Sequence, residues 1–230
     1  MLVLDPTILS RMGKLCAGGK VRPTTYDPSV ADIVLSIQNG FAGILIKATP
    51  WWFTMESARK LVLYIAQSLD GYIAREDESL DWLFKCEGAG DNGYSAFYET
   101  VDTILLGRKT YQWVLRNVES GFPYRGKKCY VFSRTLTGKS ESVEYVNQDV
   151  VSFTASLKAR HGKDIGMVGG TEVLNPLLCE KLVDDFIIHV APTIIGQGIP
   201  LFKSGSYEMW LELVKVTQYN QFVELHYRRK

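Results

Sequence analysis

The sequence has few of the residues that build metal centres or disulfide frameworks. Its 230 residues include three histidines and four cysteines, and no two cysteines form a C-x-x-C pair. The histidines are not in metal-ligand spacing, so the sequence predicts neither a bound metal nor a disulfide-stabilised fold. Scattered cysteines of this kind are typical of a reducing compartment, and we therefore expect a cytoplasmic protein.

The sequence also lacks an excess of charge and a long apolar run. Lys and Arg number 26 and Asp and Glu number 25, which gives a net charge of +1. This balance argues against nucleic acid or an anionic membrane as a partner, so an anionic ligand would need a local cluster of cations. The apolar patch at residues 33–46 is interrupted by Gln38, Asn39 and Gly40. It is shorter than the roughly 20 apolar residues of a membrane-spanning helix.

Two parts of the chain differ in composition. Residues 1–59 mix a short apolar patch with breaks such as Pro23 and Pro50, and we interpret them as an N-terminal extension of unknown role. Two interpretations stay open: an extension upstream of a start at Met55, or a small helical appendage. Residues 60–230 are predicted to form one domain.

From residue 60 onward, apolar runs alternate with segments of helical pattern. Predicted strands span residues 60–66, 103–106, 128–132, 143–146, 164–168 and 186–191, with a closing pair at 210–216 and 221–227 facing each other across 218–220. Predicted helices span 79–84, 94–101, 109–115, 153–160 and 171–180, with Thr154 as the candidate cap of the fourth helix. This alternation predicts an α/β fold with a mostly parallel central sheet, and the closing pair predicts an antiparallel C-terminal hairpin.

Three predicted strands are followed by residues suited to bind phosphate. They are Gly107, Arg108, Lys109 and Thr110, then Ser133 and Arg134, then Gly169, Gly170, Thr171 and Glu172. Each group alone is also consistent with a solvated turn or helix start, and neither the G-x-G-x-x-G fingerprint nor the P-loop lysine is present. Ligands of open sheets bind beyond the carboxyl ends of the strands, where glycine backbone and helix starts favour phosphate. Together the groups favour a dinucleotide with an extra ribose phosphate, NADPH.

Five segments in order carry a resemblance to a known family. They are Ala66 to Ala74 (AQSLDGYIA), Ile104 to Tyr111 (ILLGRKTY), Val131 to Thr135 (VFSRT), Met167 to Glu172 (MVGGTE) and Ala191 to Phe202 (APTIIGQGIPLF). The set resembles the dihydrofolate-reductase-like superfamily, in particular the branch related to the reductase domain of bifunctional riboflavin-biosynthesis enzymes. The resemblance covers residues 60–230 and implies a three-layer fold with helices on both sides of the sheet.

The resemblance also implies an activity, the transfer of a hydride from NADPH to a pterin-like or pyrimidine-like small molecule. It implies that Ala66 and Ile73 contact the nicotinamide through backbone groups. It assigns the adenosine side to Arg108, Lys109, Thr110, Ser133 and Arg134, and the pyrophosphate to Gly169, Gly170, Thr171 and Glu172. The matching glycines of dihydrofolate reductases are joined by a cis peptide, so we expect a cis bond between Gly169 and Gly170.

The acceptor end of the site is less defined. Asp70, just past the first strand, is a candidate catalytic acid, although a turn aspartate explains it equally well. Asp91 is a second candidate, because it precedes Gly107 by the offset of the substrate-binding carboxylate of dihydrofolate reductases. Tyr72 and Trp82 are the aromatic residues that we expect to contact substrate, whereas ordinary core packing is the alternative.

Two further functions stay open. The first is the 5-amino-6-(5-phosphoribosylamino)uracil reductase of riboflavin biosynthesis, although the riboflavin reductases usually carry Lys in place of Tyr72 and an acidic residue in place of Val168. The second is an NADPH-binding protein without turnover. The resemblance also suggests a homodimer that pairs through the late strands, to which the apolar segment 189–195 would contribute. We interpret His189 itself as a core or interface residue.

Overall fold

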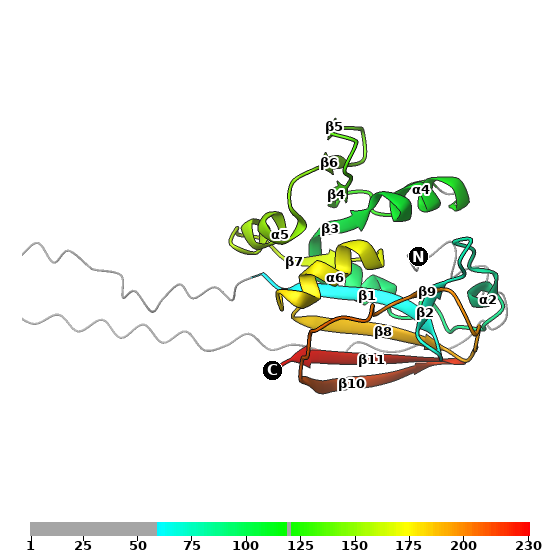
Figure 1. Cartoon of the computed structure of the whole chain (residues 1–230). Helices are drawn as coiled ribbons and strands as arrows, with labels where there is room; N and C mark the ends of the chain where they lie inside the picture. Colours follow the sequence, from blue (N-terminus) through cyan, green and yellow to red (C-terminus); the bar gives the residue numbers. More distant parts are fainter. Residues whose placement is uncertain (1–58, 119–120) are drawn as a thin grey trace, which may run out of the picture. The chain divides into compact units, whose positions relative to one another are not determined.

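The structure, a computed structural model, describes residues 59–118 and 121–230 (Figure 1). The apolar patch at 33–46 and the start predicted at Met55 lie outside the described residues. Within the described ranges, no helix has both the length and the hydropathy needed to cross a bilayer.

A nine-stranded sheet with the order β10-β11-β8-β1-β7-β3-β4-β6-β5 organises the domain. The strands are β1 (Leu61–Ser68), β3 (Val101–Gly107), β4 (Lys128–Phe132), β5 (Gly138–Lys139), β6 (Glu144–Val146), β7 (Asp164–Met167), β8 (Asp185–Ala191), β10 (Leu211–Tyr219) and β11 (Phe222–Arg229). The strands from β8 to β6 pair in parallel, whereas β11, β10 and β5 pair antiparallel. The predicted parallel centre and antiparallel C-terminal hairpin are therefore confirmed.

Helices cover both faces of this sheet, which makes three layers. The helices are α2 (Asp81–Phe84), α3 (Tyr94–Thr100), α4 (Arg108–Asn117), α5 (Val150–Lys158) and α6 (Thr171–Cys179). Successive residues of β1 point to opposite faces. Tyr64 packs in a core cluster with residues of α2, α3 and α4, and Leu63 packs in a second cluster with residues of α5 and α6. Burial on both faces explains why the central strands are continuous apolar runs, and truncating Leu63 to alanine would cost about 2–5 kcal/mol.

Some local predictions were wrong. Asp149, not Thr154, caps α5, because its side chain accepts a hydrogen bond from the Ser152 N–H at 2.8 Å. Thr154 lies buried inside the helix. β10 extends through Tyr219, so the hairpin turn falls at Asn220 and Gln221, and the φ of Asn220 is +54°. Asparagine tolerates this left-handed conformation better than most residues, which explains the later turn.

Three short strands were not predicted. β5 forms one edge of the main sheet, and β2 (Tyr72–Ala74) pairs with β9 (Ile199–Pro200) in a separate two-stranded sheet. These strands are two or three residues long, too short to show a periodic pattern in the sequence. In Figure 1 the parallel strands point toward the end of the molecule where β2 and β9 lie.

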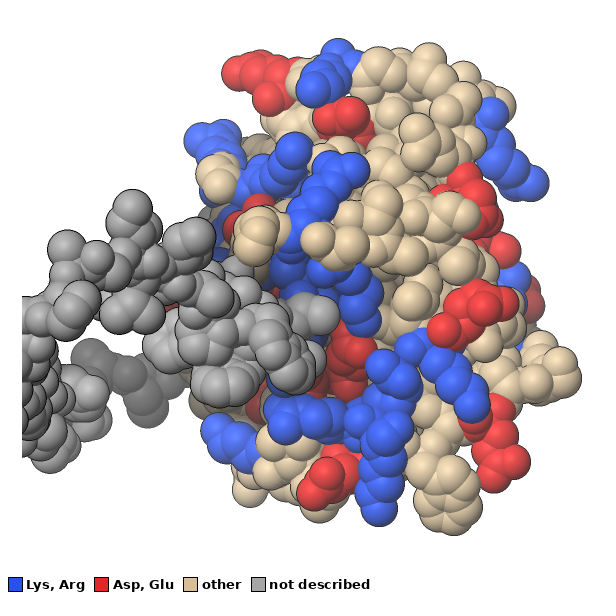
Figure 2. Space-filling model, turned by 90° about the vertical axis from the view of Figure 1, so that its left-hand side faces the viewer, with Lys and Arg blue, Asp and Glu red and all other residues tan. Residues whose placement is uncertain are grey.

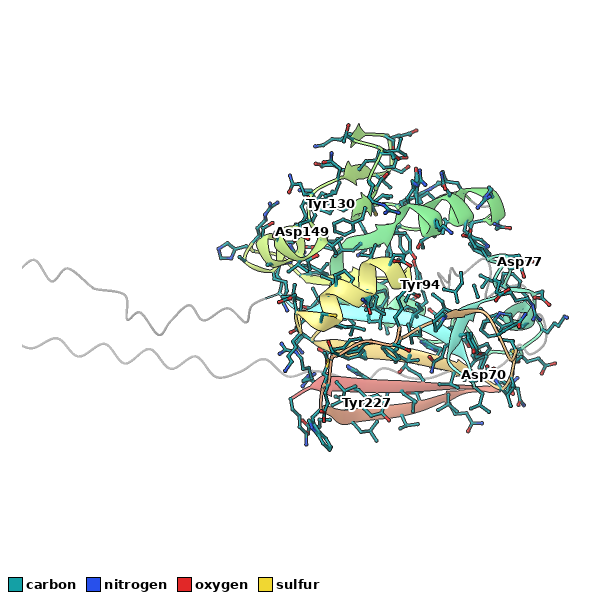
Figure 3. The ribbon with its side chains drawn as sticks, viewed as in Figure 1. Asp70, Asp77, Tyr94, Tyr130, Asp149 and Tyr227 are labelled. Atoms are coloured by element: carbon teal, nitrogen blue, oxygen red, sulfur yellow. The ribbon has the colours of Figure 1, made fainter. Side chains whose placement is uncertain are left out.

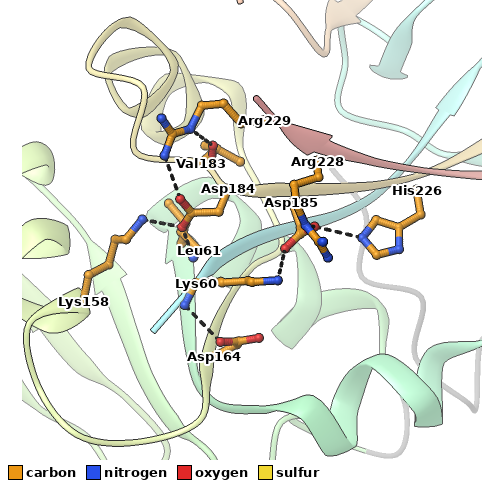
Figure 4. A network of polar contacts seen from close by, with 10 residues as sticks. All are labelled: Lys60, Leu61, Lys158, Asp164, Val183, Asp184, Asp185, His226, Arg228 and Arg229. Carbon is orange, nitrogen blue, oxygen red and sulfur yellow. Dashed lines mark hydrogen bonds and ion pairs between the residues drawn. The ribbon is translucent and has the colours of Figure 1, made fainter. Parts of the chain in front are cut away.

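Lys and Arg side chains gather at the opposite end, where the parallel strands begin (Figure 2). Many of these cations are paired with carboxylates, as the network in Figure 4 shows. Buried Asp185 lies 3.0 Å from Lys60 Nζ, 3.1 Å from His226 Nε2 and 3.0 Å from Arg228 Nε. Asp184 accepts hydrogen bonds from the Leu61 N–H and from Arg229. The network joins the starts of β1 and β8 to the end of β11 and pairs several of these cations with Asp184 and Asp185.

Candidate cofactor and acceptor site

The three predicted phosphate-binding segments lie side by side where the parallel strands end, at the carboxyl edge of the sheet. They follow β7, β3 and β4, which are neighbouring parallel strands and therefore end at the same edge. The Gly107 N–H donates to the Gly169 carbonyl at 2.9 Å. Arg108 Nη1 donates to Thr135 Oγ1 at 3.3 Å. A single extended ligand placed along this edge would reach all three segments.

Glycine backbone forms the middle of this edge. The peptide bond between Gly169 and Gly170 is cis, as predicted, and Gly169 has φ of +118°, a conformation that favours glycine. A Cβ on Gly107 would lie 3.3 Å from Val173 Cγ2 and 3.4 Å from the Gly170 backbone nitrogen. The three glycines thus keep side-chain atoms away from a place where a diphosphate can approach the main chain.

Two helices begin at this glycine edge with uncapped N-termini. α4 starts after Gly107 and α6 after Gly170, and neither receives a hydrogen bond from a side chain at its N-cap. The first turn of a helix presents N–H groups and a partial positive charge. These N–H groups, at Arg108 and Thr171 and the residues next to them, suit a phosphate anion.

The three cations of this edge differ in whether a carboxylate already pairs with them. Arg108 and Arg134 are exposed, and neither forms an ion pair with a residue of 59–118 or 121–230. Lys109 instead forms an ion pair with Glu78, with Nζ 2.7 Å from Oε1. The two arginines are therefore the groups available for an added phosphate, and Lys109 has a competing partner.

The remaining predicted contacts are polar residues that are buried or already have partners. Ser133 is buried, and its Oγ accepts from the Leu136 N–H at 3.0 Å. Thr110 is fully buried in the first turn of α4. Thr171 Oγ1 donates to the Pro200 carbonyl at 2.8 Å, which ties α6 to β9. Glu172 is exposed and forms an ion pair with Lys203. The lysine offsets the negative charge that would otherwise repel a phosphate at this place.

The nicotinamide end of the predicted site lies at the end of β1. Ala66 is fully buried in β1 and Ile73 is buried in β2, so the backbone is what both residues offer to a ligand. Tyr72 is partly exposed and pairs with Pro200 across β2 and β9. Trp82 is 2% exposed within the core cluster of α2, and its indole N–H has no hydrogen-bond partner among the described residues.

Asp70 joins two loops at this end of the sheet (Figure 3). Its carboxylate accepts from Ser68 Oγ at 2.6 Å and from the Gly196 N–H at 2.8 Å, and it also contacts the Ile195 N–H. The slight burial of Asp70 would raise its pKa, but these hydrogen bonds outweigh it and hold the pKa below its ordinary value. A carboxylate stabilised in its charged form is a poor proton donor at neutral pH.

Asp91 has a similar local role at the start of α3. Its side chain accepts from the Ser95 N–H at 2.8 Å and from the Gly93 N–H at 3.0 Å. Partial burial would raise its pKa, but the hydrogen bonds from Ser95 and Gly93 dominate and lower it. Both predicted acids thus carry backbone hydrogen bonds that fix loops, and the structure does not bring Asp70 and Asp91 together in an interaction.

The sequence analysis placed His189 in the core or an interface, but it gave no role to Glu224 of β11, which lies beside it. His189 is fully buried, and its Nε2 lies 3.4 Å from Glu224 Oε2. Tyr64 stacks on Phe97 at 4.1 Å and meets His189 edge-on at 5.0 Å. The sequence did hold a signal for the burial of Glu224. Residues two apart on a strand point to the same face, so Glu224 lies on the same inward face as the apolar Phe222.

No three His, Cys, Asp or Glu side chains in the described ranges lie close enough to hold a metal ion. The glycines and uncapped helix starts of this edge are groups that suit phosphate. The family model for the RibD C-terminal domain matches residues 59–225. The chain belongs to this family. Its fold is that of dihydrofolate reductases, as the resemblance implied.

Individual relatives agree with this assignment. Uncharacterized protein YwjB of Bacillus subtilis is 49% identical over 172 residues, which cover 74% of this chain and 98% of YwjB. A putative riboflavin biosynthesis protein from Shewanella sp. PV-4 superposes with a TM-score of 0.66 at 30% identity, covering 74% of this chain and 99% of that one. Dihydrofolate reductase from Enterococcus faecalis, complexed with NADP(H), gives a TM-score of 0.57 at 17% identity and covers 74% and 96%. This last likeness shows the fold.

Proposed function

We propose that the protein is an NADPH-dependent reductase that transfers a hydride to a pterin-like or pyrimidine-like small molecule. The observation that carries the proposal is the pair of arginines without ion-pair partners, Arg108 and Arg134, at the strand ends that flank a glycine-lined edge. The NADP(H)-bound state of the dihydrofolate reductase of similar fold supports it.

Different residues of this edge would bind different parts of the cofactor. Uncapped N–H groups at the starts of α4 and α6 would bind the diphosphate, and Gly107, Gly169 and Gly170 would allow its approach. Arg108 and Arg134 would bind the 2′-phosphate, because guanidinium groups suit phosphate geometry. Ala66 and Ile73 would orient the nicotinamide through their backbones. NADPH, when bound, supplies the hydride.

Cofactor binding can be tested by thermal unfolding with NADPH and with NADH. A ligand present at 100 times its dissociation constant should add about 2.7 kcal/mol to the free energy of unfolding. We expect NADPH to stabilise the protein more than NADH does at equal concentration. Equal stabilisation by the two cofactors would contradict the assignment of Arg108 and Arg134 to the 2′-phosphate.

The riboflavin-pathway reductase is a narrower candidate within the same family, and the family match favours it. Val168 is 1% exposed and apolar where riboflavin reductases carry an acid, and Tyr72 replaces a lysine near the substrate phosphate. Oxidation of NADPH should therefore be measured with the ribosylaminopyrimidine and with unphosphorylated pterins. Turnover of the ribosylaminopyrimidine alone would favour the riboflavin-pathway reductase. Binding of NADPH without turnover of any of these compounds would favour a non-catalytic protein.

We also propose that the protein pairs with a second copy of itself along β10. This edge strand exposes Leu213, Val214 and Val216 by 53%, 43% and 53%. A long edge strand with exposed apolar side chains can pair with another strand, and a two-fold axis would satisfy both copies. Light scattering of the wild type should show a dimer, and V216K should shift it toward monomer. A monomeric wild type at micromolar concentration would contradict this proposal.

A further inference from the structure

A polar pocket opens at the end of the sheet where the parallel strands begin, and we call it the strand-start pocket. Its volume is about 330 Å³, and its lining residues are Arg59, Asp102, Thr103, Gly126, Lys128, Leu157, Arg160 and His161. Thr103 precedes Gly107 by four residues on β3, so the pocket and the glycine edge lie roughly 13 Å apart along this strand. The pocket is therefore separate from the proposed cofactor site, and it lies at the basic end of the molecule that Figure 2 shows.

Two strands and one helix bring these residues together on the face that α5 covers. Thr103 of β3 pairs with Lys128 of β4, and residues paired directly across neighbouring strands point to the same face. Tyr130, two residues after Lys128, packs in the core cluster that also holds Leu157 of α5, so Lys128 projects to the α5 face. Arg160 follows the end of this helix. The starts of β3 and β4 and the end of α5 thus bound the pocket.

One wall of the pocket is a buried guanidinium that is already held in position. Arg59 is 6% exposed, and its Nη2 donates to Asp102 and, at 2.8 Å, to Thr103 Oγ1. Its Nε donates to the Lys163 carbonyl, whereas Nη1 has no hydrogen-bond partner within 59–118 and 121–230. Asp102 also accepts from the Lys163 N–H at 2.8 Å and from Thr103 Oγ1 at 2.7 Å. The carboxylate is therefore occupied by its neighbours, and the guanidinium keeps a donor for a ligand.

The pocket carries an excess of positive charge. Three Lys or Arg side chains and one carboxylate line it, and +3 with −1 leaves +2 when His161 is neutral. Lys128 and Arg160 are exposed, and neither forms an ion pair with a residue that the structure describes. The pKa of neighbouring Lys127 is lowered, first by burial and then by the positive charge of Lys163. The charge excess and the unpaired cations indicate an anionic ligand.

The size and the donors of the pocket narrow the chemical class of this ligand. Guanidinium groups bind phosphate oxygens through paired N–H groups, and an ammonium adds a point charge. A volume near 330 Å³ lies at the lower end of the range for small-molecule sites, which suits a compact ligand. Gly126 offers open backbone, because a Cβ there would meet no atom within 4 Å, and Leu157 offers apolar contact. These surfaces suit the carbon skeleton that a phosphate ester carries.

We propose that the strand-start pocket binds a small phosphate monoester of the size of ribose 5-phosphate. Arg59, Lys128 and Arg160 would hold the phosphate, and Gly126 and Leu157 would contact the organic part. The inference goes beyond the proposed function and does not depend on it. The competing explanation is that the exposed cations are only solvated, since a cation such as Arg160 is also favourable next to a helix C-terminus.

Calorimetry on the full chain tests the proposal with ribose 5-phosphate, inorganic phosphate and ribose. We expect ribose 5-phosphate to bind more tightly than inorganic phosphate, and ribose not to bind. K128Q/R160Q should weaken ribose 5-phosphate binding at least about tenfold, because two charged donors are lost. Both side chains are exposed, so this variant should fold. R108Q/R134Q is the matched control, because it removes two cations from the glycine edge, and it should bind ribose 5-phosphate as the wild type does.

Amide NMR locates the ligand without any substitution. Ribose 5-phosphate should shift the backbone N–H signals of Gly126, Lys128 and His161, and it should leave those of Gly107 and Gly170 unchanged. Added salt should weaken the binding, because Lys128 and Arg160 are exposed to the solvent.

Four results would overturn the inference. The first is no binding of ribose 5-phosphate by the wild type at millimolar concentration, and the second is wild-type affinity in K128Q/R160Q. The third is a loss of affinity in R108Q/R134Q with shifts at Gly107 and Gly170, which would place the ester at the glycine edge. The fourth is equal affinity for inorganic phosphate and ribose 5-phosphate, which would exclude a site for the ester. Failure of NADPH to stabilise the protein would contradict the proposed function alone.

Discussion

Arg108 provides a sharp test of cofactor choice. R108Q removes one guanidinium from the edge and keeps a shorter, uncharged polar side chain. Arg108 is exposed, and its guanidinium donates a 3.3 Å hydrogen bond to Thr135. The substitution should therefore leave the free energy of unfolding nearly unchanged. Loss of the guanidinium should weaken binding of the 2′-phosphate by about 1–2 kcal/mol, between the values for exposed ion pairs and for charged hydrogen bonds.

This energy corresponds to roughly a 5- to 30-fold weaker affinity for NADPH. NADH lacks the 2′-phosphate, so its affinity should stay the same in R108Q. Fluorescence titration of both cofactors at low salt measures the two constants, and added salt should narrow the gap because exposed charges are screened. R116Q, on the same helix and exposed, is the control. Equal losses for NADPH and NADH, or no loss for either, would refute the reasoning.

Three other substitutions probe separate parts of the structure. D70N should lower stability by about 1 kcal/mol in denaturant titration and reduce turnover less than tenfold, whereas a loss of about 10²-fold or more would identify Asp70 as the acid. D185N should cost about 2–4 kcal/mol, because Lys60 and His226 lose a buried carboxylate. G107A should fold, since φ of −79° suits alanine, yet weaken NADPH binding at least about fivefold by adding a methyl to the edge.

The pH dependence of D185N has a defined sign. Burial would raise the pKa of Asp185, but hydrogen bonds from Lys60, His226 and Arg228 lower it overall. A lowered folded-state pKa stabilises the protein fully above the ordinary aspartate value of about 3.9, and this stabilisation is lost as the pH falls through the folded pKa. The unfolding free energy of D185N should therefore change less than that of the wild type below about pH 4. Parallel curves for the two proteins would contradict this account.

The strands and the edge shared by the three candidate phosphate-binding segments were predictable because their signals are local. Buried parallel strands appear as continuous apolar runs, and glycines, cations and hydroxyls follow them directly in the sequence. Parallel strands share one edge, so the sequence order of Gly107, Arg134 and Gly169 was enough to place them together. The cis bond between Gly169 and Gly170 followed from resemblance and is confirmed.

The buried contacts between β8 and β11 depend on long-range pairing. Glu224 meets His189 because β11 pairs with β8 in one register, and a shift by one residue would turn both side chains to the other face. The ion pair of Lys109 with Glu78 likewise joins residues 31 positions apart through a loop without a periodic pattern. Asp149 lies three residues before Ser152, which is N-cap spacing, so the signal for the correct cap of α5 was present in the sequence.

A crystal structure of the NADPH complex tests the central claim most directly. We predict the diphosphate against the backbone of Gly107 and Gly170, at the starts of α4 and α6. The 2′-phosphate should lie between Arg108 and Arg134, within hydrogen-bond distance of at least one guanidinium. A cofactor bound away from this edge, or a 2′-phosphate that touches neither arginine, would contradict the account.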